Sequence, residues 1–129
     1  MSWWVYLVTD REKWDADGED YEDAVAEVES HQEGGTYAMG GIGKAELSVT
    51  YNYGGSFRDH VEGLKESGLS GLDGQRAGDW IEPMKAAIQA LGTERDEEYW
   101  ADTEGNAGHA LSILLGWAKQ YPDAMFAVH

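Results

Sequence analysis

The chain has 129 residues, no cysteine, and 25 acidic against nine basic residues, which gives a formal net charge of −16. The length predicts one domain with a core of its own, and the lack of cysteine excludes disulfides, thiolate metal sites and a cysteine nucleophile. The charge excludes nucleic-acid binding through a basic groove, because an acidic surface repels phosphate groups.

The acidic residues are concentrated in two segments. Residues 10–33 hold eleven acidic and two basic residues, and residues 93–104 hold six acidic residues and one arginine, so the two segments carry −14 of the net −16. Such segments are typical of a solvated face, of adaptation to high salt, or of a phosphate-like charge presented to a basic partner. The sequence leaves these three interpretations open.

Residues 3–9 predict a strand, because aromatic and β-branched side chains dominate them. Both alternating sets are apolar, so this strand should be central in its sheet and covered on both faces. The apolar run at the start of the chain is six residues long, and no run approaches the ~20 apolar residues of a membrane span. We therefore expect a soluble, cytoplasmic protein with no membrane partner.

An acidic insertion occupies about residues 10–35 of the predicted single domain, 1–129. Within it, YEDAVAEVES at 21–30 predicts a short helix, although Ala24, Ala26 and Val28 would also suit a strand. The stretch DADGED at 15–20 does not fit a calcium loop, because glycine at position six and glutamate at position twelve are both missing.

A hairpin follows, with strands near residues 36–39 and 44–53 joined by a glycine-rich connection. Ser56 and Asp59 have the spacing of a capping box, so a helix should begin there and end near Gly68. The side chains expected on its buried face are Phe57, Val61 and Leu64.

Two more helices and a closing strand complete the pattern. Asp79 is the expected N-cap of the first helix, which places Pro83 in or next to the first turn, where its missing N–H costs little. The second helix follows TEGN at 103–106 and ends at Tyr121-Pro122-Asp123, before a strand at 124–128. Its expected buried stripe comprises Ala107, Leu111, Leu114, Leu115 and Ala118, with Trp117 off the stripe.

Together these elements predict an α+β fold. Strands near residues 3–9, 36–39, 44–53 and 124–128 should form a small, mainly antiparallel sheet, with about three helices packed on one of its faces.

The end of the strand at 44–53 is the best candidate site. Thr50 and Asn52 should project from one side of the strand, the glycine pair 54–55 would let a ligand approach the backbone, and Arg58 lies in the next helical turn. Such a corner suits a carboxylate, a phosphate or a backbone amide. A solvated sheet face with an ordinary Asn-Gly type of turn is the competing interpretation.

His60 and His109 are further candidates, because either could reach this corner if the fold brings the helix ends together. The four histidines do not have metal-binding spacing, and no nucleophile or paired carboxylate signature is present. The sequence therefore predicts no metal, no cofactor and no catalytic residue. It favours a protein that is not an enzyme.

Trp100 stands out among six tryptophans, because it lies in an acidic segment. Aromatic residues bordered by charge are typical of an interface core and its rim, and they also occur as lids on a small core. Trp100 is therefore a candidate for partner binding.

Several short motifs resemble a group of small α+β proteins of bacteria and their phages. The motifs are Thr50-Tyr51-Asn52, Phe57-Arg58, Leu72-Asp73-Gly74, Ala77-Gly78, Gly-Asn-Ala-Gly-His-Ala-Leu-Ser-Ile-Leu-Leu at 105–115, and Tyr121-Pro122-Asp123-Ala124. The resemblance covers the first strand and residues 36–129. The chain departs from the group in its acidic insertion and at Tyr-Trp-Ala-Asp-Thr, 99–103, where the group commonly has Gly-Trp-Gly-Asp-Tyr. The resemblance implies the order of elements and the T-x-N/Arg corner, and no reaction.

Three functions remain as hypotheses. The first is a non-catalytic accessory protein of a bacterium or phage that binds a host protein or a copy of itself through acidic and aromatic surface, or a small ligand at the corner. The second is a protein or enzyme that binds a small, nucleotide-like or carboxylate-bearing molecule through Thr50, Asn52 and Arg58. The third is a structural subunit of an assembly. The sequence does not decide the oligomeric state.

Overall fold

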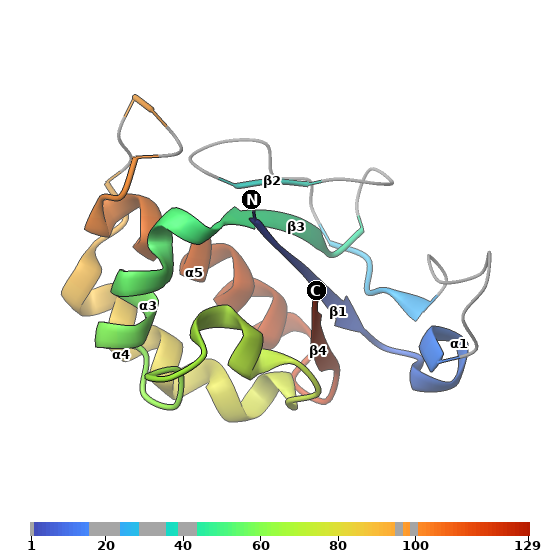
Figure 1. Cartoon of the computed structure of the whole chain (residues 1–129). Helices are drawn as coiled ribbons and strands as arrows, with labels where there is room; N and C mark the ends of the chain where they lie inside the picture. Colours follow the sequence, from blue (N-terminus) through green and yellow to red (C-terminus); the bar gives the residue numbers. More distant parts are fainter. Residues whose placement is uncertain (1, 16–23, 29–35, 39–43, 95–96, 99–100) are drawn as a thin grey trace.

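The computed structural model describes residues 2–15, 24–28, 36–38, 44–94, 97–98 and 101–129. Within them, four strands form one antiparallel sheet in the order β2-β3-β1-β4, and helices α3, α4 and α5 lie together on one side of it (Figure 1). The α+β architecture is therefore confirmed.

The bounds of the elements are as follows. The strands are β1 (Ser2–Val8), β2 (Thr36–Ala38), β3 (Glu46–Thr50) and β4 (Met125–Val128). The helices are α1 (Arg11–Asp15), α3 (Gly54–His60), α4 (Ile81–Leu91) and α5 (Glu104–Gln120), and three 3-10 turns are η1 (Tyr51–Tyr53), η2 (Gly68–Leu72) and η3 (Ala77–Trp80).

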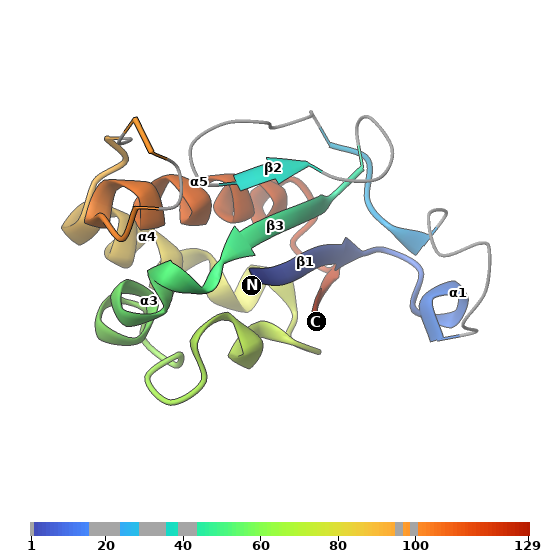
Figure 2. The same ribbon diagram turned by 45° about the horizontal axis from the view of Figure 1, so that its top comes forward.

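Strand β1 is central, as its two apolar sets predict, and it lies between β3 and β4 (Figure 2). Its inner side chains Trp3, Val5 and Leu7 are buried in the core, and Trp3 packs on Phe57 of α3. The outer set of Ser2, Trp4 and Tyr6 is half-buried. The side chains of β1 are therefore fully buried only on the face that the helices cover, and on the other face they are half-buried.

The predicted boundaries around α3 are wrong. The strand ends at Thr50 rather than at residue 53, because residues 51–53 form η1. Helix α3 begins at Gly54 without a side-chain cap and ends at His60. The chain then turns at Gly63, whose φ of +99° favours glycine and whose position leaves no room for a Cβ beside the Trp80 ring. The expected apolar contacts survive, since Phe57, Val61 and Leu64 are all buried.

The described part of the acidic insertion is mostly extended after α1. Val25 bridges to Val8 and Glu27 bridges to Lys44, so the helix predicted over 21–30 is wrong for residues 25–27. The strand alternative holds there, because this short segment adds to the end of β1, where Ala26 N donates to Leu7 O at 2.8 Å. The DADGED stretch lies outside the described residues from residue 16 onward.

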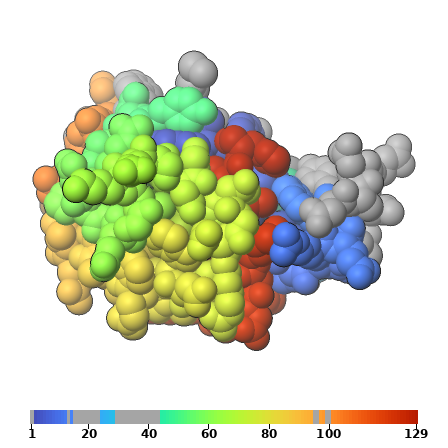
Figure 3. Space-filling model, turned by 60° about the horizontal axis from the view of Figure 1, so that its bottom comes forward, coloured from blue at the N-terminus to red at the C-terminus, as the bar shows by residue number. Residues whose placement is uncertain are grey.

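Residues 73–78 form a strap that runs along the outer edge of β4. The strap explains three of the motifs, L-D-G, A-G and P-D-A, because each supplies one end of a hydrogen bond (Figure 3 shows the red C-terminal residues beside the yellow-green strap). The backbone bonds are Gly74 N to Phe126 O, Phe126 N to Gln75 O, Ala77 N to Ala124 O and Gly78 N to Pro122 O, at 2.8 to 2.9 Å. Gly78 leaves no room for a Cβ next to Pro122 O.

Arg76 and Asp73 reinforce the strap with side-chain bonds. Arg76 donates to Asp123 at 2.7 Å and to Asp79 at 3.0 Å. These bonds, the one to Asp123 first, raise the pKa of the guanidinium above its usual value, so Arg76 stays charged. At the first residue of the strap, Asp73 Oδ1 accepts a hydrogen bond from Val128 N at 2.9 Å.

Replacing Asp73 by alanine is expected to lower the free energy of unfolding by about 1 to 2 kcal/mol, because a partly buried backbone donor loses a charged acceptor. Asp73→Asn keeps a side-chain oxygen at the same place and should lose less than half as much. Urea denaturation of both variants measures the difference. Equal losses in the two variants would mean that the Val128 bond is not what Asp73 contributes.

Helix α4 begins at Ile81, and not directly after Asp79, because residues 77–80 form η3. Pro83 still falls in the first turn, where no intrahelical donor is needed.

Helix α5 is buried around most of its circumference, since it packs between α4 and the sheet (Figure 2). The predicted stripe of Ala107, Leu111, Leu114, Leu115 and Ala118 is confirmed. Trp117, predicted off the stripe, is only 2 % exposed, and its indole N–H has no hydrogen-bond partner within the described residues. A helix enclosed on several sides does not show a single apolar stripe in its sequence.

Candidate functional site

The strand-end corner differs from its predicted form. Asn52 is not on the strand with Thr50, because η1 starts at Tyr51. The hydroxyl of Thr50 instead accepts the backbone N–H of Asn52 at 3.3 Å and so caps η1. The structure brings these two residues together as a local cap, and Asn52 is exposed.

Arg58 is exposed on α3, and its guanidinium lies 3.8 Å from the position that a Cβ on Gly54 would take. The edge of the Trp3 ring lies 3.4 Å from the same Cβ position. The ring of Tyr51 contacts the Trp3 ring edge-on, with 4.7 Å between the ring centroids, and Tyr51 is 42 % exposed. The corner therefore consists of an arginine and a tyrosine that flank a nearly buried indole.

The remaining predicted candidates are dispersed. His60 is the last residue of α3 and His109 lies in the second turn of α5, and both are half-buried. The backbone oxygen of His109 accepts the hydroxyl of Ser112 at 2.6 Å. Trp100 lies outside the described residues. The structure thus places the two histidines on different helices.

The polar side of β3 is covered and not open. Glu46 and Ser48 are each 4 % exposed, and Ser48 donates a hydrogen bond to the hydroxyl of Ser2 on β1 at 3.0 Å. Neighbouring Trp4 and Tyr6 face the same side, because β1 pairs Trp4 with Ser48 and Tyr6 with Glu46. The alternation that suggested a binding face therefore builds the outer side of the sheet.

We call the described residues 94, 97–98 and 101–104, which lie before and at the start of α5, the acidic turn. Asn106, which is fully buried, holds this turn in place, because its side-chain amide donates to Glu98 O at 3.2 Å and to Ala101 O at 3.1 Å. Thr103 caps the helix by accepting Asn106 N at 3.1 Å. A buried asparagine between glycine and alanine was the available sequence signal, and sequence reasoning did not use it.

Several carboxylates of the acidic turn point to solvent. Glu94, Glu97, Asp102 and Glu104 are exposed, and no ion pair reaches them from any residue that the structure describes. Ion pairs elsewhere occupy Glu27, Asp79, Glu82 and Asp123. The four carboxylates of the acidic turn named above are therefore not neutralised by an ion pair with a described residue.

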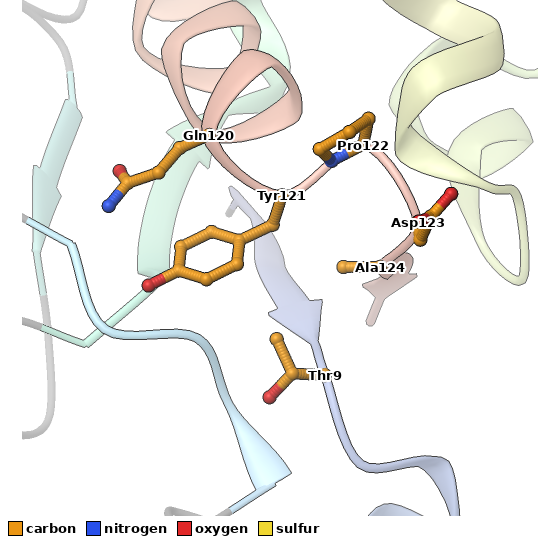
Figure 4. A pocket seen from close by; sticks show the side chains of 6 residues that line it. All are labelled: Thr9, Gln120, Tyr121, Pro122, Asp123 and Ala124. Carbon is orange, nitrogen blue, oxygen red and sulfur yellow. The ribbon is translucent and has the colours of Figure 1, made fainter.

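A hollow of about 320 Å³ lies at the opposite end of α5 (Figure 4). Its lining comes from the end of β1, the last residue of α5 and the turn before β4, namely Thr9, Gln120, Tyr121, Pro122, Asp123 and Ala124. Sequence reasoning treated this turn only as a helix stop.

Metal binding and membrane insertion receive no structural support from the described ranges. Among these residues, no three histidine or acidic side chains lie close enough together to hold a metal ion. Their helices also lack the combined length and apolar character that a membrane span requires.

No family model matches this chain, and neither a curated protein nor a solved structure matches it. The resemblance to the bacterial and phage group therefore stays a prediction. The motifs that carry it have structural explanations here: the strap for three of them, and the start of α5 for the Gly-Asn-Ala-Gly motif.

Proposed function

We propose that the protein is a non-catalytic accessory protein that binds a basic partner protein through its acidic surface. The observation that carries this proposal is the acidic turn, in which Glu94, Glu97, Asp102 and Glu104 are exposed and form no ion pair with a described residue. The Asn106 amide bonds to Glu98 O and Ala101 O, and Thr103 caps α5, so the backbone at these residues is tied to the helix.

The distribution of charge supports a partner surface rather than a uniform solvation layer. The chain carries a net charge of −16, and the segment at 93–104 accounts for −5 within twelve residues. A concentrated negative field raises the association rate of a basic partner, an effect that salt weakens. A cytoplasmic setting agrees with the lack of cysteine, and the bacterial and phage resemblance favours a host protein as partner.

The test compares two triple variants that remove the same charge. Glu94→Gln, Glu97→Gln and Asp102→Asn neutralise the acidic turn, and Asp59→Asn, Glu62→Gln and Glu66→Gln neutralise exposed acids on α3 and the loop after it. The probe is a fluorescent ten-residue peptide of lysine and arginine, and anisotropy measures its affinity. We expect the first variant to bind about tenfold more weakly, since each exposed charge pair contributes about 0.5 kcal/mol.

The second variant is the control for net charge. It should change the affinity less than about threefold, because its carboxylates do not lie in the acidic turn. If both variants weaken binding equally, only overall charge matters, and the acidic turn is a solvated surface.

A further inference from the structure

We propose that the hollow at the end of α5 is a binding site for a positively charged side chain, a guanidinium or ammonium group of the basic partner. This inference rests on the proposed function, because it names the group by which that partner is recognised. The site would be separate from the acidic turn, since the two lie at opposite ends of the 17-residue helix α5.

The hollow lies at the C-terminus of a helix. Gln120 is the last residue of α5, and Tyr121 N closes the helix by donating to Trp117 O at 2.9 Å. The following backbone oxygens of a last turn have no intrahelical donor, and they carry the negative end of the helix dipole. A cation placed there is favoured, and an anion is disfavoured.

An aromatic ring, that of Tyr121, lies in the middle of the lining. In Figure 4 the ring of Tyr121 stands between Gln120 on one side and Thr9 and Ala124 on the other. Tyr121 Oη donates to Glu27 O at 2.8 Å, which fixes the ring in place. A fixed tyrosine ring with an apolar neighbour offers a surface on which a guanidinium can stack.

The charge at the rim of the hollow is negative. Asp123 lines the hollow and shares Arg76 with Asp79, so this group of three side chains keeps a net charge of −1. The exposed carboxylate of Glu27 forms an ion pair with Lys44 at 3.7 Å, and this pair adds no net charge. No cationic side chain is among the six lining residues.

The size of the hollow fits one side chain. About 320 Å³ is near the lower limit of small-ligand sites, which run from about 300 to 1,000 Å³. A larger cofactor would not be enclosed. The helix C-terminus, the aromatic ring and the net negative charge all favour a cation. The group that fits this hollow is therefore an arginine or lysine side chain.

The test is an NMR titration of the full chain with N-acetyl-arginine methylamide. We expect saturable shifts of the backbone amides of Thr9, Gln120, Tyr121, Asp123 and Ala124, with a Kd of about 1 to 10 mM for so small a probe. The matched probe N-acetyl-citrulline methylamide has nearly the same shape without charge and should leave these signals in place. Equal shifts with both probes, or none with arginine, overturn the proposal.

Two variants of equal charge locate the binding. Gln120→Lys places an ammonium group at the hollow and should abolish the shifts. Gln89→Lys adds the same charge on α4, where Gln89 lines a different hollow, and should preserve them. If the two variants behave alike, the probe senses only net charge and the site is not in this hollow. Tyr121→Leu removes the aromatic ring and should abolish the shifts; undiminished shifts in this variant, with the fold intact, would overturn the stacking of a cation on the ring.

The source of the cation is decided by competition with the lysine and arginine peptide. If that peptide displaces the arginine probe from residues 120–124, the group comes from a partner chain. If the probe binds and the peptide does not displace it, the hollow takes free small cations and the proposal of a partner side chain fails. If the peptide binds only at the acidic turn, the proposed function stands while this site falls.

Discussion

Replacing Gly108 by alanine is expected to lower the free energy of unfolding by about 3 kcal/mol, even though alanine is the better helix former. The new Cβ would overlap the backbone oxygen of Gly92 and come within 3.3 Å of Leu91 Cβ. Both contacts lie at the end of α4, so the two helices would have to separate. Overpacking of this kind costs about 1 to 3 kcal/mol and sometimes more, while the gain in helix propensity is about 1 kcal/mol.

Gly116 provides the matched control in the same helix. A Cβ on Gly116 meets nothing within 4 Å, and the residue is exposed. Gly116→Ala should therefore stabilise the protein by up to about 1 kcal/mol. Urea or thermal denaturation of both variants gives the comparison. Equal stability of the two variants would mean that α4 and α5 do not approach each other as closely as the structure shows.

The second large effect is expected at Asn106. Replacing it by leucine should lower the free energy of unfolding by about 2 to 4 kcal/mol, because two backbone oxygens in the acidic turn lose their donor and the larger apolar group does not replace it. Hydrogen exchange of residues 101–103 should also become faster, since two of the hydrogen bonds that hold the turn to α5 are then lost.

Gln89 serves as the control for this second prediction. It carries an amide side chain, lies on α4 and is exposed. Gln89→Leu should change stability by less than about 0.5 kcal/mol. A loss in Asn106→Leu no greater than in Gln89→Leu would show that the buried amide does not support the turn.

The sheet was predictable from local patterns because its strands are either apolar on both sides or alternate strictly. Residues 3–9 and 44–50 show this clearly, and the structure places both in the middle of the sheet. The end of β3 was not predictable by alternation, because residues 51–53 continue the apolar and polar alternation while the hydroxyl of Thr50 stabilises a 3-10 turn instead. Side-chain capping competes with the strand here.

The helix ends were missed for a related reason. The predicted helix does not continue past Gly63, because the backbone of Gly63 has a positive φ and lies against the Trp80 ring. Trp80 comes from a later part of the chain. A local pattern cannot report that contact. The same holds for Trp117, whose burial depends on the surroundings of α5 rather than on its own spacing.

The candidate site was predictable only in part. The corner has the predicted arginine, but Thr50 is used as a cap, and Asn52 turns away from the strand. The hollow at residues 120–124 depends on three elements that are far apart in the sequence, since Thr9 comes from the end of β1. The two glycines of Gly105-x-x-Gly108 were a usable signal for close helix packing, and they identify the contact with residues 92 and 94.

The strap at residues 73–78 also bears on how this protein avoids self-association. An uncovered outer strand presents a row of backbone donors and acceptors that can template growth of an intermolecular sheet. Here Gly74 N and Gln75 O already form hydrogen bonds with the backbone of Phe126 in β4. This edge of the sheet therefore cannot pair with an extended segment of another molecule unless residues 73–78 first detach. The strap thus protects that side of the sheet against fibril-like polymerisation.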